Sequence, residues 1–165
     1  VTLHRRENIE SAIAEVSSAI AELANRDDLQ FVIPVHPNPN VKKILNKALG
    51  NQKNVFLIKP ISYFKFIGLM RKSFLVVTDS GGIQEEAPTL NVPVLVARET
   101  TERPEAVDVG AAKLVGTKAG DVVRTILHLI ENPAEYDKMK HAKNPFGDGK
   151  ASQHIAEYFC SLLPS

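Results

Sequence analysis

The sequence contains a single cysteine, Cys160, and no long apolar run. One cysteine excludes a disulfide within the chain and any cysteine-rich metal site. No apolar stretch approaches the roughly 18 residues that a membrane-spanning helix needs, and the charged start at 1–8 has no apolar core behind it, which argues against a signal peptide. The 20 Lys and Arg residues nearly balance the 19 Asp and Glu residues, for a net charge of +1, so a surface that coats nucleic acid is not expected. These absences predict a soluble, cytoplasmic protein that binds neither membranes nor nucleic acid.

Motifs of several cofactor and nucleotide enzymes are also missing. There is no G-x-G-x-x-G, so a nicotinamide cofactor is not expected, and no G-x-x-x-x-G-K-[ST], so the chain is not a P-loop NTPase. Ser80 lacks the G-x-S-x-G frame of hydrolases, because Thr78 stands at the first glycine position. No Cys, His and Asp cluster has metal-ligand spacing. The sequence therefore predicts a protein that uses no metal and no cofactor.

What the 165 residues do contain is an alternation of short apolar runs and amphipathic periods. Apolar residues between Ile9 and Leu23 recur with the spacing of one helix face, whereas 31–33 is a continuous apolar run of the buried-strand type. The same patterns predict helices over 9–23, 41–49, 64–71, 83–89, 122–130 and 151–163, and strands over 1–3, 31–33, 54–58, 74–77, 93–96 and 113–115. Alternating buried strands and helices predict an α/β fold, a doubly wound parallel sheet in one domain over 1–165. Ordinary strands have about 5–6 residues, so 1–3 is expected to be the end of a truncated first strand.

Four polar segments follow predicted strands in this arrangement. They are residues 4–8, 36–40, 79–86 and 98–105. In open parallel sheets, ligands bind beyond the carboxyl ends of the strands. We therefore expect the four segments to converge on one site.

The segment Asp79-Ser80-Gly81-Gly82 follows a predicted strand and opens a predicted helix. Glycines at this point let a ligand approach the backbone closely. The free N–H groups and the helix dipole favour an anion such as a phosphate, and Ser80 adds a hydroxyl. A tight strand–helix turn without a ligand has the same sequence, so the segment alone leaves both interpretations open.

Charged residues near this turn could complete an anion site. A carboxylate of Glu85 or Glu86 could accept two hydroxyls of a sugar, but their spacing from the glycines does not decide between them. Arg103 could clamp a diphosphate, although the segment taken alone slightly favours a solvated loop with local ion pairs. His4 and His36 follow predicted strands, where histidines are more often surface residues than catalysts.

Five segments, taken in order, resemble one enzyme family. They are 2–8 (TLHRREN), 34–40 (PVHPNPN), 79–88 (DSGGIQEEAP), 100–106 (TTERPEA) and 144–149 (NPFGDG). Together they are similar to the C-terminal half of the bacterial non-hydrolysing UDP-N-acetylglucosamine 2-epimerases, and the resemblance covers nearly the whole chain. It implies one half of a GT-B architecture, in which two Rossmann-like domains face a cleft. It also implies interconversion of UDP-GlcNAc and UDP-ManNAc by elimination and re-addition of UDP, without metal or nicotinamide.

The resemblance implies roles for individual residues near the glycines. Ser80, Gly81 and Gly82 match positions that bind phosphate through the backbone and a hydroxyl. Glu86 matches the glutamate that binds the ribose, which selects it over its neighbour. Arg103 matches an arginine near the diphosphate.

Further roles fall on more distant segments. Phe66 matches an aromatic residue near the uracil, and His4 matches a catalytic histidine beside the leaving diphosphate. Arg5 and His36 match positions that contact a second, regulatory substrate molecule. The family's catalytic carboxylates come from an N-terminal domain that this chain lacks, so the chain is expected to bind UDP but to be inactive alone.

The resemblance also implies a homodimer for the full-length enzyme. Two other functions stay open at this point. One is half of a GT-B glycosyltransferase, which would transfer a sugar to an acceptor. The other is a non-catalytic module that binds UDP-sugars.

Overall fold

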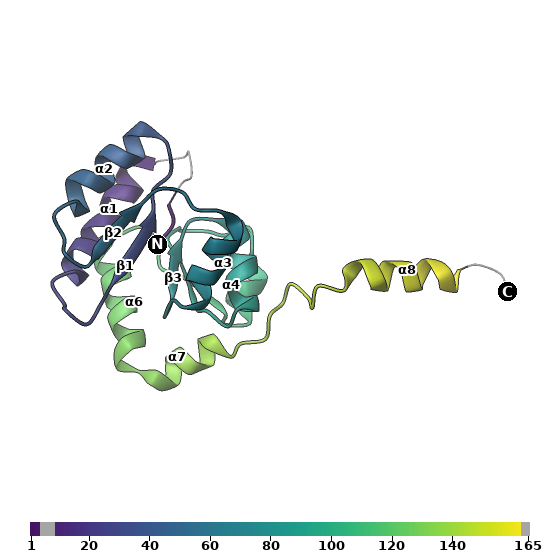
Figure 1. The fold of residues 1–165 in the computed structure, drawn as a ribbon. Helices are drawn as coiled ribbons and strands as arrows, with labels where there is room; N and C mark the ends of the chain where they lie inside the picture. The colour runs from purple at the N-terminus through teal and green to yellow at the C-terminus, as the bar shows by residue number, and fades with distance from the viewer. Residues whose placement is uncertain (4–8, 163–165) are drawn as a thin grey trace.

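A computed structural model describes residues 1–3 and 9–162. These residues form eight helices and five strands, which alternate along most of the chain (Figure 1). The strands are β1 (Phe31–Pro34), β2 (Val55–Ile58), β3 (Val76–Thr78), β4 (Val94–Val96) and β5 (Ala112–Leu114). The helices are α1 (Ile9–Leu23), α2 (Pro39–Leu49), α3 (Tyr63–Arg71), α4 (Gly81–Thr89), α5 (Pro104–Asp108), α6 (Ala119–Glu131), α7 (Pro133–Lys140) and α8 (Ala151–Ser161). None of these helices combines the length and the hydropathy needed to traverse a bilayer.

The strands pair in parallel, and the N-terminal segment joins them into one arrangement. β1 pairs with β2, and β4 lies between β3 and β5. The Val1 nitrogen donates to the Val32 carbonyl at 2.9 Å, and Thr2 exchanges two backbone hydrogen bonds with the other group of strands, at 2.9 and 3.3 Å. The order is therefore β2, β1, the N-terminal segment, β3, β4, β5. This order reverses beside β3, as in a Rossmann-like doubly wound sheet, and the predicted fold class is confirmed.

Three helices contribute buried residues to the core on each face of the sheet. Alternate residues of a strand point to opposite faces, so neighbouring strand residues belong to different cores. In β3, Val77 belongs to one apolar core and Val76 to the other, and Leu95 and Val94 divide in the same way in β4. The first core takes buried residues from α1, α2 and α6. The second takes them from α3, α4 and α5. β3 and β4 are buried at every residue, as expected for strands covered on both faces, whereas β1 and β2 are only partly buried.

Two helices, α5 and α7, were not predicted from the sequence, and both begin at a proline. The pair Asn132-Pro133 was expected to end a helix, and α6 does end at Glu131. Pro133 then begins α7 as well, since the first turn of a helix tolerates a residue without an N–H group. The prediction considered Pro133 only as the end of a helix. A proline can follow one helix or begin the next, and its position in the sequence does not distinguish these two roles.

The last helix stands away from the rest of the molecule (Figure 1). α8 was predicted, and it contains no buried residue. Its large apolar side chains Ile155, Tyr158 and Phe159 are all exposed. The described part of the chain therefore provides no cover for the apolar side of α8.

Candidate functional site

The candidate site lies where the strand order reverses. Thr78, at the end of β3, is fully buried, and its hydroxyl lies 2.7 Å from the hydroxyl of Thr2. The Thr78 oxygen also accepts the N–H of Ser80 at 3.0 Å. These two contacts hold the turn that leads from β3 into α4. Doubly wound sheets bind their ligands at this switch point.

The amino end of α4 presents backbone donors there. Ser80 is the N-cap residue, with an extended backbone (φ −87°, ψ 131°) and no capping hydrogen bond from its side chain to a described group. Gly81 and Gly82 begin the helix, so their N–H groups have no acceptor within it. A Cβ at Gly82 would meet no described atom nearer than the Ser80 Oγ, at 4.0 Å. The backbone at Gly82 is therefore accessible in the described part of the chain, as an anion site requires.

Gly81 has a different neighbour. A Cβ at this position would lie 2.8 Å from Oε1 of Glu102, closer than van der Waals contact. The other oxygen of the same carboxylate pairs with the Arg98 guanidinium. The end of a flexible side chain thus occupies the space that Gly81 leaves, and a Cβ there would require the Glu102 carboxylate to move.

A buried polar chain attaches the loop after β4 to α4. The Gln84 side chain is fully buried; its Nε2 donates to the Ser80 carbonyl at 3.1 Å, and its Oε1 accepts the Thr101 hydroxyl at 2.6 Å. The Thr101 oxygen in turn accepts the N–H of Arg103 at 3.0 Å. Sequence reasoning gave Gln84 and Thr101 no role. Their spacing in the sequence does not predict that they are in contact. The sequence also does not distinguish a buried glutamine from an exposed one.

Arg103 lies against α4, where an internal carboxylate already holds it. Its Nε donates to Glu85, and its Nη1 donates to the carbonyl of Glu102 at 3.0 Å. The hydrogen bond from Arg103 to Glu85, and then the charge of Glu85, raise the pKa of the guanidinium. Glu86 instead accepts a hydrogen bond from the Tyr63 hydroxyl at 3.3 Å. The two glutamates that the sequence left open therefore differ in their partners, and Glu86 is the one without the arginine.

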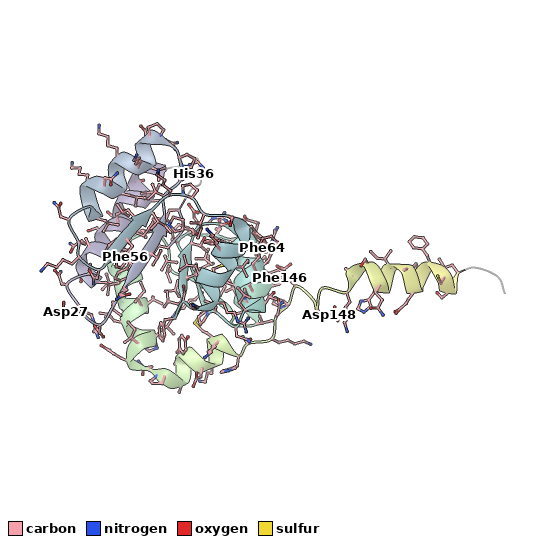
Figure 2. The ribbon with its side chains drawn as sticks, in the orientation of Figure 1. Asp27, His36, Phe56, Phe64, Phe146 and Asp148 are labelled. Atoms are coloured by element: carbon pink, nitrogen blue, oxygen red, sulfur yellow. The ribbon has the colours of Figure 1, made fainter. Side chains whose placement is uncertain are left out.

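The remaining predicted site residues do not join this network in the described structure. His4 and Arg5 lie outside the described residues. His36 is exposed beyond the end of β1 (Figure 2), where its Nδ1 accepts the N–H of Asn38 at 3.3 Å. Phe66 is half-buried on α3 and lines a cavity of about 280 Å³. The lining of that cavity includes both ends of β1, Phe31 and Pro34, and the segment from Ser73 to Val77 that contains the start of β3.

Within 1–3 and 9–162, no group of three or more His, Cys, Asp or Glu side chains is arranged to hold a metal ion. The candidate site is thus built from backbone N–H groups, two arginines and several carboxylates. Such a set can bind an anion and accept hydrogen bonds from hydroxyls.

Comparison with known proteins identifies the family. The family model for UDP-N-acetylglucosamine 2-epimerase matches residues 1–159. The UDP-N-acetylglucosamine 2-epimerase of Escherichia coli (strain K12) is 49% identical over 158 residues, which are 95% of this chain and 42% of that protein. The Campylobacter jejuni enzyme of the same name is 50% identical over 156 residues, or 94% of this chain and 41% of that protein.

Solved structures agree with the sequence comparison. The UDP-GlcNAc 2-epimerase from Neisseria meningitidis bound to UDP-GlcNAc superposes with a TM-score of 0.91 and 48% identity, over 97% of this chain and 43% of that one. An S. aureus co-structure with UDP gives a TM-score of 0.92 and 42% identity, over 99% and 47% of the two chains. A glycosyltransferase from Rickettsia africae, with a TM-score of 0.69 over 86% of this chain, is only 15% identical, which shows a shared fold and nothing more.

The lengths of these proteins matter for what the chain does. It spans less than half of the relatives that it matches, 42% of the Escherichia coli enzyme. Its Rossmann-like sheet corresponds to one half of their GT-B architecture. With a family model that matches nearly all of its length, the chain belongs to the UDP-N-acetylglucosamine 2-epimerase family.

Proposed function

We propose that this chain is the nucleotide-binding half of a UDP-N-acetylglucosamine 2-epimerase and that it holds UDP at the amino end of α4. The observation that carries the proposal is the accessible helix start at Gly82, located at the switch point of the sheet. Two relatives that share its fold and at least 42% of its sequence were solved with UDP or UDP-GlcNAc. A diphosphate is the part of such a ligand that a helix start favours most.

Each residue near α4 has a distinct task in this proposal. The diphosphate accepts hydrogen bonds from the N–H groups at the helix start and from the Ser80 hydroxyl. Arg103 exchanges Glu85 for a phosphate oxygen, which it can grip with two parallel hydrogen bonds. Glu86 accepts the ribose hydroxyls in place of the Tyr63 hydroxyl. These exchanges use only groups that lie on α4 or against it.

Residues farther away complete the proposed site by the family resemblance. Phe66 contacts the uracil, and His4, which follows the N-terminal segment, stands beside the leaving diphosphate. Arg5 and His36 contact a second, regulatory substrate molecule. The full-length enzyme works in the cytoplasm as a homodimer.

The proposed reaction divides the chemistry between two halves. When UDP leaves the sugar, negative charge develops on the diphosphate, and the helix start and Arg103 stabilise that charge in the transition state. Proton transfer at the second carbon of the sugar needs a positioned base. The resemblance places the carboxylates for that step in the other half of the enzyme. This chain alone should therefore bind UDP without epimerising its substrate.

Calorimetry with UDP tests the nucleotide site. Arg103→Ala should weaken binding about tenfold or more, because a charge-assisted hydrogen bond contributes about 1.5–3 kcal/mol. Glu86→Ala should also weaken UDP binding, since the ribose hydroxyls lose their hydrogen-bond acceptor. Arg124→Ala is the matched control, because Arg124 pairs with an exposed carboxylate on α6, away from α4. If both site variants bind UDP as tightly as the unmodified chain, the site is not where we place it.

A second experiment tests the division of chemistry. The chain is incubated with UDP-GlcNAc in deuterated water, and the proton on the second sugar carbon is followed by NMR. We expect no deuterium at that carbon. Incorporation would show that the chain contains its own base and would refute the division between halves.

A further inference from the structure

Both arginines beside the start of α4 are engaged by carboxylates of the protein itself. Arg98 pairs with Glu102, and Arg103 pairs with Glu85. The Arg98 side chain is only 17% exposed, so it needs a counter-charge whether or not a ligand is present. An anion that binds at α4 therefore competes with these carboxylates for the two guanidinium groups.

Glu102 occupies a special place among these carboxylates. Its Oε1 lies over Gly81, the first residue of α4, at 2.8 Å from where a Cβ would stand. A carboxylate at the first turn of a helix gains from the helix dipole, as a phosphate would. A phosphate placed at the same helix start would repel it. The two anions thus compete for one region of positive potential.

We propose that the Glu102 carboxylate takes the place of the ligand anion in the unliganded protein. It occupies the start of α4 and pairs with Arg98 until a diphosphate displaces it. The diphosphate then binds both the helix start and the Arg98 guanidinium. The proposal rests on the proposed function, since it assigns Arg98 as a second diphosphate ligand of the same site and Glu102 as the residue that sets its selectivity. A ligand without phosphate offers Arg98 no new counter-charge, so it cannot replace Glu102. The exchange favours the diphosphate over an uncharged nucleoside.

A purely structural role for Glu102 makes a different prediction. Arg98 and Glu102 are four residues apart, and the pair could simply stabilise the loop that carries Arg103. Removing the carboxylate would then loosen the loop and weaken every ligand of the site. The competing-anion role instead predicts tighter binding, and only for ligands that carry phosphate.

The test is Glu102→Gln, with Glu99→Gln as its matched control. Glutamine keeps the size of the side chain and can still accept a hydrogen bond from Arg98. Glu99 lies on the same loop, and its carboxylate also contacts a glycine, Gly116, at 3.0 Å from the Cβ position. Because the Glu99 carboxylate contacts Gly116 and is not among the atoms nearest Gly81 or Gly82, the control makes the same change in net charge on this loop without removing the anion at the helix start.

Binding of UDP and of uridine is measured by calorimetry for all three proteins. For Glu102→Gln we expect roughly tenfold tighter binding of UDP, equivalent to about 1.4 kcal/mol, and no gain for uridine. Glu99→Gln should leave both affinities unchanged. Equal or weaker binding of UDP by Glu102→Gln, or an equal gain for uridine, would overturn the proposal.

A second measurement tests the role of Glu102 independently of whether the chain binds UDP. Inorganic pyrophosphate is titrated into the unmodified chain and into Glu102→Gln, and the backbone amide resonances of Gly81 and Gly82 are followed by NMR. Larger shifts at lower pyrophosphate in Glu102→Gln support the competing anion, even if UDP fails to bind and the proposed function is rejected. No difference between the two proteins overturns the proposal, even if UDP binds.

Discussion

Thr101→Val tests whether the buried contact with Gln84 holds the site together. The substitution keeps the shape of the side chain and removes the hydroxyl that donates to Gln84 Oε1 at 2.6 Å. Gln84 is fully buried, so its oxygen then has no partner and no water. A buried polar atom left unpaired costs about 1–3 kcal/mol. We expect the free energy of unfolding to fall by about 2 kcal/mol, from the middle of that range.

The assay is urea denaturation followed by circular dichroism, with a thermal melt beside it. For a domain of 165 residues, a loss of about 2 kcal/mol should lower Tm by about 4–8 °C. The affinity for UDP should fall too, because the Thr101 oxygen also accepts the N–H of Arg103 and so orients that side chain.

The matched control is Thr125→Val in α6. Its hydroxyl donates to the carbonyl of Asp121 at 2.9 Å, and this carbonyl keeps its helical hydrogen bond after the substitution. The control should therefore change the free energy of unfolding by less than about 1 kcal/mol, the typical net worth of one hydrogen bond. If Thr101→Val costs no more than the control, the argument from buried polar contacts is refuted.

Three other predictions concern the site and its support. Gly82→Ala should weaken UDP binding in calorimetry with little change in Tm, because a Cβ there meets no described atom nearer than 4.0 Å. Gly81→Ala should also change Tm little, because the carboxylate that its Cβ meets is the end of a flexible side chain and can move. Glu85→Gln should strengthen UDP binding several-fold by releasing Arg103 from its charged partner; unchanged affinity would show that this ion pair persists in the complex. Asn54→Ala should lower the free energy of unfolding by about 1–3 kcal/mol in urea titrations, because its side chain donates to two backbone carbonyls before β1, and a neutral result would show that water replaces both contacts.

The order of strands could not be predicted from periodicity. Apolar runs such as β4 could be located because all three residues of that strand are buried. They contain no information on which strands are neighbours. The N-terminal segment took its place between β1 and β3 through backbone hydrogen bonds, and backbone groups are the same in every residue. The expected truncated first strand stays a prediction.

The choice between Glu85 and Glu86 shows the same limit within the site. Both lie in the first two turns of α4, and local spacing treats them alike. The docked loop gives them different partners, because it brings Arg103 to Glu85 and leaves Glu86 with Tyr63. The resemblance to a family selected Glu86, and that assignment to the ribose stays a prediction.

By itself the sequence determined the alternation of strands and helices and the helix that the segment Asp79-Ser80-Gly81-Gly82 opens, since these depend on contacts between residues close in the chain. Its motifs also identified the family, which the comparisons confirm. Only the tertiary structure decided that Gln84 is buried, that Thr101 satisfies it, and that Glu102 lies over Gly81. These contacts join residues about 20 positions apart across a crossover between parallel strands. Their partners are set by how β3 and β4 align in the sheet, which no local pattern in the sequence records.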